Sequence, residues 1–173
     1  MSEPVLVAYA SRYGSTQEVA VEIADTLRKA GLAVDLWPAR DVKGLDGYGA
    51  VVLGAPLYIM RWHKDARNFL SRHKKALTRL PVAVFALGPL QPDEKEVQAC
   101  RKQLEKALSK FPWLHPEAVQ LFVGKYDPAN LGFLHRLMTK GSASPLHNLP
   151  ASDNRDWQAI RAWASDLAAA IQP

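Results

Sequence analysis

The sequence predicts an α/β fold in which helices cover both faces of a parallel sheet. Five short apolar segments alternate along the chain with segments of helical periodicity, a pattern typical of parallel sheets. The apolar segments are almost continuous runs, as expected for strands that are buried on both faces. With 173 residues and one cysteine, the chain is expected to fold as a single domain, residues 1–173, without a disulfide.

The first strand and the first helix show this pattern most clearly. The apolar run Val5–Ala10 ends abruptly at a hydroxyl-rich turn. Apolar residues such as Val19, Ile23 and Leu27 then recur at helical spacing, and Gly31 is expected to close the helix. The other four strands are expected at 33–37, 48–54, 82–87 and 118–123.

Three later segments also have helical periodicity. Residues 62–79 are expected to form one amphipathic helix with a basic face. The helix before the fifth strand has Asp93 as a favourable N-cap, and Glu96 three residues later fits a capping box. The last helix is expected to begin near Asp153, after an insertion at about 125–152.

The turn after the first strand has the composition of a phosphate site. A helix N-terminus offers backbone N–H groups and a positive dipole end, and the hydroxyls there add further donors. Gly14 allows the backbone to come close to a ligand. An ordinary helix cap is the alternative, because Ser and Thr serve that purpose in many helices. The candidate phosphate-binding residues are Ser11, Arg12, Tyr13, Gly14, Ser15 and Thr16.

Two further turns, 54–62 and 88–92, are expected at the same edge of the sheet, where open parallel sheets bind ligands. Both turns are too apolar and aromatic for ordinary solvated loops. Tyr58, Ile59 and Trp62 would cover a flat ring, and backbone amides of the 88–92 turn would reach its polar edge. Alternatively these side chains pack on neighbouring helices, Trp62 above all. The candidate ring-binding residues are Pro56, Leu57, Tyr58, Ile59, Gly88, Pro89 and Leu90.

Other kinds of site lack their signatures. The chain has no dinucleotide-binding or Gly-Lys-Ser/Thr phosphate loop, no zinc-type Cys/His spacing and no Gly-x-Ser-x-Gly nucleophile turn. The five histidines are scattered, and His73 is expected in the core. Cys100 lies on an apolar helix side, which favours a packed thiol over a nucleophile. We therefore assign no catalytic side chain and expect no metal.

The positive charge is concentrated in one segment. The chain carries a net charge of +5, and residues 61–80 hold seven Lys or Arg against one Asp. A solvated helix face is one interpretation of this segment. The other is attraction of an anionic small-molecule substrate, or of an anionic membrane that carries quinones, through residues 64–79. No nucleic-acid partner is expected.

The turn sequences resemble those of a known family. The stretch Tyr-Ala-Ser-Arg-Tyr-Gly-Ser-Thr, followed by a helix rich in Ala and Val, is similar to the FMN phosphate loop of the flavodoxin family. The segments Gly54–Tyr58 and Leu87–Pro89 match the two loops that flank its isoalloxazine ring. The resemblance implies a flavodoxin-like three-layer sandwich, a five-stranded parallel sheet in the order 2-1-3-4-5, and FMN as cofactor.

Within that family the chain looks most like the menaquinone-dependent protoporphyrinogen IX dehydrogenases. The Ser-Arg-Tyr-Gly-Ser-Thr loop, the insertion and the pattern from Asp153 to Trp157 carry this resemblance. It implies an FMN-dependent oxidoreductase that passes electrons to a quinone. The single cysteine suits a reducing cytoplasm, and the basic residues 64–79 would allow peripheral contact at the inner face of the membrane. In the insertion, residues 131, 134, 137 and 138 share an apolar helical side that would lie on a membrane, cap the flavin or pack on the domain.

Two other functions stay open. One is an electron-transfer or stress-related flavodoxin, which is an electron carrier and not an enzyme. Positive charge near a flavin eases formation of its anionic reduced form, and this favours the oxidoreductase over a low-potential carrier. The other is a flavodoxin-like interaction module that has lost its flavin.

Overall fold

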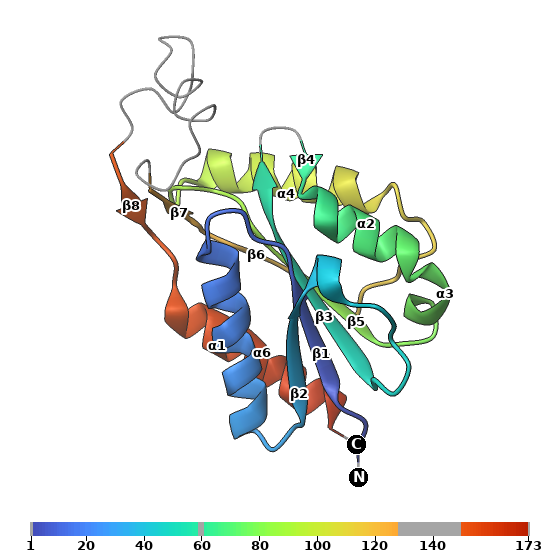
Figure 1. Ribbon diagram of the computed structural model, residues 1–173. Coiled ribbons are helices and arrows are strands. Elements are labelled where there is room, and N and C mark those ends of the chain that lie inside the picture. Colours follow the sequence, from blue (N-terminus) through green and yellow to red (C-terminus); the bar gives the residue numbers. More distant parts are fainter. Residues whose placement is uncertain (1, 59–60, 128–149, 173) are drawn as a thin grey trace.

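Five parallel strands form the central sheet of the computed structural model, which describes residues 2–58, 61–127 and 150–172 (Figure 1). The strands are β1 (Val5–Tyr9), β2 (Val34–Pro38), β3 (Ala50–Tyr58), β5 (Val82–Leu87) and β6 (Ala118–Phe122). Their order is β2-β1-β3-β5-β6, and every pair is parallel. The predicted sheet and its 2-1-3-4-5 order are therefore confirmed.

Helices cover both faces of this sheet, as predicted (Figure 1). One face carries α1 (Ser15–Lys29) and α6 (Trp157–Ile171). The other carries α2 (Lys64–Arg72), α3 (Lys74–Leu77), α4 (Glu94–Leu108) and the 3-10 turn η1 (Ala39–Asp41). The side chains of β1 alternate between the two layers, since Val5 and Val7 pack on the α1 side while Leu6 packs on the α2 side.

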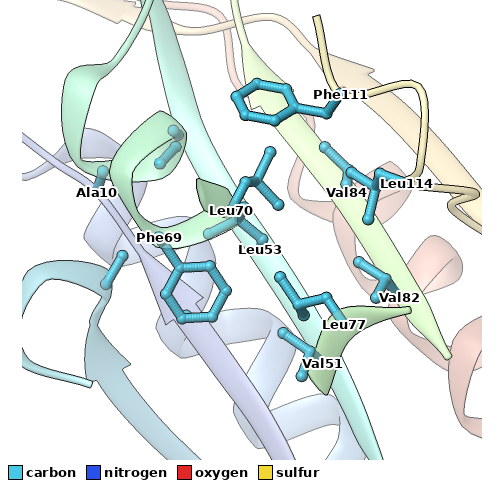
Figure 2. Packing of buried hydrophobic residues seen from close by; sticks show 14 of the residues in the cluster. Ala10, Val51, Leu53, Phe69, Leu70, Leu77, Val82, Val84, Phe111 and Leu114 are labelled. Carbon is cyan, nitrogen blue, oxygen red and sulfur yellow. The ribbon is translucent and has the colours of Figure 1, made fainter. Parts of the chain in front are cut away.

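The core beneath α2 and α3 fixes the position of these helices on the sheet. Phe69 and Leu70 of α2 and Leu77 of α3 pack against Leu53 of β3 and Val84 of β5 (Figure 2). All five side chains are almost fully buried. Burying a side chain of this size stabilises the fold by about 1.5–3 kcal/mol, so this layer is firmly attached to the sheet.

The expectation of one continuous helix over residues 62–79 is wrong. Trp62 belongs to the short strand β4 (Arg61–Trp62), which pairs antiparallel with the end of β3. His73 leaves helical geometry, with φ −105° and ψ 16°, and separates α2 from α3. Its ring is buried, and its Nε2 lies 3.2 Å from the Val42 carbonyl. This confirms that His73 is a core residue.

Two more boundaries differ from the expected ones. β3 continues through Gly54 to Tyr58. A Cβ at position 54 would lie 1.8 Å from the Phe85 ring, so only glycine allows β3 and β5 to pack there. The last helix begins at Trp157 with Asp156 as its N-cap, and not near Asp153. Asp153 lies instead in β8 (Ser152–Asp153), which pairs with β7 (Lys125–Tyr126) at the base of the insertion. The apolar segment expected at 131–138 lies outside the described residues.

Candidate functional site

The turn between β1 and α1 has the geometry of an anion site. Gly14 is the N-cap of α1 and has a φ of 89°, a left-handed conformation that favours glycine. The Gly14 N–H donates to Ser11 Oγ at 2.9 Å, so the Ser11 side chain folds the turn and still has its own hydrogen to donate. The N–H groups of Ser15, Thr16 and Gln17 form the first turn of α1, which has no intrahelical acceptors.

Thr16 supplies the observation that fits a phosphate best. Its side chain is fully buried, and among the described residues its Oγ1 has no hydrogen-bond partner. A buried hydroxyl without a partner costs about 1–3 kcal/mol, so natural proteins seldom keep one without a reason. A phosphate at the N-terminus of α1 would accept this hydrogen together with the N–H groups of the same turn.

The end of β3 lies within electrostatic range of this turn. Burial raises the pKa of Tyr58, and Tyr13 raises it further while Arg12 lowers it. The rings of Tyr58 and His63 are 5.8 Å apart, and Arg12 is among the groups that, after burial, lower the pKa of His63. The chain therefore brings together the first two predicted turns. Ile59 lies outside the described residues.

The end of β3 also meets the 88–92 turn. Pro56 and Pro89 are buried, and a Cβ at Gly88 would lie 3.1 Å from the Leu57 and Cys100 side chains. Burial raises the pKa of the Cys100 thiol, and nearby Glu96 raises it further, which fits a packed thiol and not a nucleophile.

Trp62 does not cover a ring. Its side chain is 1% exposed, and its indole N–H donates to the Ala55 carbonyl at 3.1 Å. The alternative that Trp62 belongs to the core is confirmed.

The amides of the 88–92 turn have partners within the protein, contrary to the expectation that they are available to a ring. Leu90 N–H donates to Glu96 Oε1 at 2.6 Å, and Gln91 N–H donates to Glu96 Oε2 at 3.3 Å. Gly88 N–H donates to the Phe122 carbonyl at 3.2 Å. The reason is that the Glu96 carboxylate reaches past the helix end to the turn that precedes it.

Sequence reasoning missed two residues that connect the base of the insertion to both sides of the site. Asn154 Nδ2 donates to the Leu90 carbonyl at 2.6 Å. Arg155 has a side chain only 3% exposed, donates to the Ser15 carbonyl at 3.2 Å, and forms ion pairs of 2.7 Å with Glu18 and Asp153. The one signal in the sequence is the pattern from Asp153 to Trp157, which predicts a helix start and not these contacts.

The basic segment is divided between two edges of the sheet. Arg61 and Lys64 are exposed near the carboxyl end of β3, where β4 and the start of α2 lie (Figure 1). Lys74 and Lys75 lie in α3, near the start of β5 at the opposite edge. The nine residues of α2 alone span about 13 Å, which exceeds the screening length of about 8 Å at physiological salt. We expected one basic face that begins at the 54–62 turn. Only the first basic residues, Arg61 and Lys64, lie near that turn.

With this geometry established, comparison with known proteins gives the family. The model of the flavodoxin domain family matches residues 6–145. The chain belongs to the flavodoxin family. This confirms the resemblance found in the turn sequences and identifies FMN as the cofactor. Which residues hold FMN stays a prediction.

Relatives and solved structures agree with this membership. The chain is 22% identical over 174 residues to the protoporphyrinogen IX dehydrogenase [quinone] of Escherichia coli K12, covering 94% of this chain and 93% of that one. A short-chain flavodoxin associated with a non-canonical PDU bacterial microcompartment superposes with a TM-score of 0.59 at 14% identity, covering 99% and 100% of the two chains. Flavodoxin 1 of Bacillus cereus superposes with 0.55 at 16% identity, covering 96% and 97%. These flavodoxin-family structures share the fold.

No helix in the described part of this flavodoxin-family chain is both long and apolar enough to cross a membrane.

Proposed function

We propose that this chain is an FMN-dependent oxidoreductase of the protoporphyrinogen IX dehydrogenase type, which takes electrons from an anionic substrate and passes them to a quinone. The observation that carries the cofactor assignment is the buried, unpartnered Thr16 hydroxyl at the N-terminus of α1. The substrate assignment is supported by the distant relative, a quinone-dependent protoporphyrinogen IX dehydrogenase that aligns along 94% of the chain.

In this proposal the three turns divide the work of holding the cofactor. Thr16, Ser15 and the first-turn N–H groups of α1 bind the phosphate, while Tyr58 and the 88–92 turn lie on the two sides of the ring. Bound FMN supplies the two-electron redox chemistry. Burial raises the pKa of Tyr58 and lowers that of His63, so both rings are uncharged near neutral pH. The protein therefore contributes binding and orientation.

Two exposed cations at the carboxyl edge of the sheet give the site its preference for anions. Arg61 and Lys64 lie at β4 and at the start of α2. A positive potential at the mouth of a site raises the rate of encounter with an anionic substrate, such as the carboxylates of a porphyrinogen, and added salt weakens this effect.

The test is an anaerobic assay of the FMN-loaded protein with protoporphyrinogen and menadione. We expect turnover, and we expect the double variant Arg61→Glu, Lys64→Glu to lower kcat/KM with a defect that shrinks as salt is added. The matched control is Lys74→Glu, Lys75→Glu, which makes the same change of charge at the far edge and should leave kcat/KM nearly unchanged. A yellow protein that does not oxidise protoporphyrinogen but reduces a partner protein one electron at a time would instead be an electron carrier. A protein that binds no FMN would be an interaction module.

A further inference from the structure

We propose that Glu96 lowers the reduction potential of the bound cofactor by holding two backbone amides of the 88–92 turn that would otherwise bond the polar edge of its ring. This inference rests on the proposed placement of the ring beside that turn. It goes beyond the proposed function because it assigns the tuning of the cofactor to one side chain of α4.

The geometry is that of an anion bound by backbone amides. Leu90 N–H and Gln91 N–H belong to successive residues and converge on one carboxylate, at 2.6 Å to Oε1 and 3.3 Å to Oε2. Amides that converge in this way form a concave site for negative charge, and hydrogen bonds from them to a carboxylate are stronger than bonds to a neutral acceptor. The protein's own side chain therefore occupies an anion site at the edge of the proposed cofactor pocket.

Helix capping does not account for this contact. In a capping box the Glu carboxylate returns to the N–H of the N-cap residue. Here the first half of the box is present, since Glu96 N–H donates to Asp93 Oδ2 at 3.1 Å. The carboxylate, however, extends beyond the N-cap to Leu90 and Gln91. Pro92 intervenes and has no N–H to offer.

The turn is also held from its other side, through its carbonyl groups, so it keeps its place when the Glu96 contact is weakened. Gly124 N–H donates to the Pro89 carbonyl at 2.7 Å, and Asn154 Nδ2 donates to the Leu90 carbonyl at 2.6 Å. The 88–92 turn thus lies between α4 on one side and the residues at the base of the insertion on the other.

The electrostatic consequence concerns mainly the reduced cofactor. Reduced FMN carries negative charge on its polar edge, and amide donors directed at that edge would stabilise the charge. Glu96 removes those donors and adds a negative charge of its own nearby. Both effects favour the neutral, oxidised cofactor. They oppose the effect of Arg61 and Lys64 at the same edge.

The test compares Glu96→Gln with the control Glu94→Gln, which removes the same charge from the same helix turn at an exposed position. Gln has the shape of Glu but only one acceptor oxygen, which is neutral, and its NH2 group cannot accept a hydrogen bond. One amide is therefore held less firmly and the other loses its partner. We expect Glu96→Gln to tighten binding of reduced FMN relative to oxidised FMN at least about tenfold, a rise of about 30 mV in the two-electron midpoint potential. The control should stay near the wild-type potential. In the FMN-free protein, the NMR signals of the Leu90 and Gln91 amides should shift in Glu96→Gln and stay in place in Glu94→Gln.

The outcomes separate this inference from the proposed site. If FMN binds and depends on Thr16, but the potential of Glu96→Gln equals that of the wild type, the inference is overturned and the proposed site stands. An equal rise in both variants also overturns it, because only the general charge of the helix end would then matter. If FMN binding does not depend on Thr16, the proposed site itself fails, whatever the amide signals show.

Discussion

Replacing Thr16 by Val should make the FMN-free protein more stable and its affinity for FMN weaker. Valine has the shape of threonine, is also β-branched and has a similar helix propensity, so the substitution removes one hydroxyl and little else. Because Thr16 is fully buried and its Oγ1 has no partner among the described residues, the two effects have opposite signs.

The magnitudes follow from the state of that hydroxyl. Without a ligand, its burial costs about 1–3 kcal/mol, and the methyl group avoids this cost. A gain of about 1 kcal/mol raises the Tm of a domain of this size by about 2–4 °C. With the ligand, a hydrogen bond to a charged phosphate contributes about 1.5–3 kcal/mol, so Thr16→Val should raise the Kd for FMN about 10- to 150-fold.

Thermal unfolding of the FMN-free protein and fluorescence titration with FMN measure the two effects. The control is Thr26→Val on the same helix, whose hydroxyl already donates to the Glu22 carbonyl at 2.8 Å. That variant should lose a little stability and keep its affinity. A Thr16→Val protein that is less stable than the wild type, or that binds FMN equally well, would refute the reasoning. The Ser11–Thr16 turn would then be an ordinary helix N-terminus without a phosphate site.

Three further predictions concern how the site is supported. Gly54→Ala should destabilise the fold by about 1–3 kcal/mol or more in urea unfolding, because its Cβ would lie 1.8 Å from the Phe85 ring; wild-type stability would mean that this ring moves freely. Burial lowers the pKa of His63, whose Nδ1 accepts the Asp65 N–H at 3.1 Å. The stabilisation that neutral His63 contributes is therefore complete above the unfolded pKa of about 6.5 and is lost as the pH falls through the folded pKa. His63→Asn should then make the fall of Tm below about pH 6.5 less steep. An unchanged slope of Tm against pH would contradict this role. Arg155→Met should lower the free energy of unfolding in urea by about 1–2 kcal/mol. This is less than for a fully buried ion pair, because the carboxylates of Glu18 and Asp153 stay partly solvated. An unchanged urea midpoint would show that these ion pairs contribute nothing.

The strands and the turn between β1 and α1 could be predicted because their signals are local. Buried parallel strands are continuous apolar runs, and the Ser11–Thr16 turn joins a strand and a helix that are adjacent in the chain. The prediction of one helix over 62–79 was wrong because the alternation of polar and apolar residues continues through His73, whereas the helical backbone ends there. The break coincides with a contact between the His73 ring and the carbonyl of Val42, 31 residues away.

The supporting contacts of the site could not be predicted for the same reason. Arg155 bonds to Ser15 across 140 residues, and Asn154 bonds to Leu90 across 64. Single polar residues in a loop carry no periodicity that would reveal such partners. The capping-box pattern at Glu96 was visible, but it predicts a bond to the helix end and not to the preceding turn.

The short β7–β8 ladder holds the two ends of the insertion together. Because Lys125–Tyr126 pairs with Ser152–Asp153, the insertion leaves and re-enters the domain at one place. A segment whose ends are already held together can be lengthened, shortened or exchanged at little entropic cost to the remainder of the chain. The cofactor turns would keep their bonds to Asn154 and Arg155 through such exchanges. The length of the insertion can therefore vary between related chains while the β1–α1 and 88–92 turns keep the contacts that hold them.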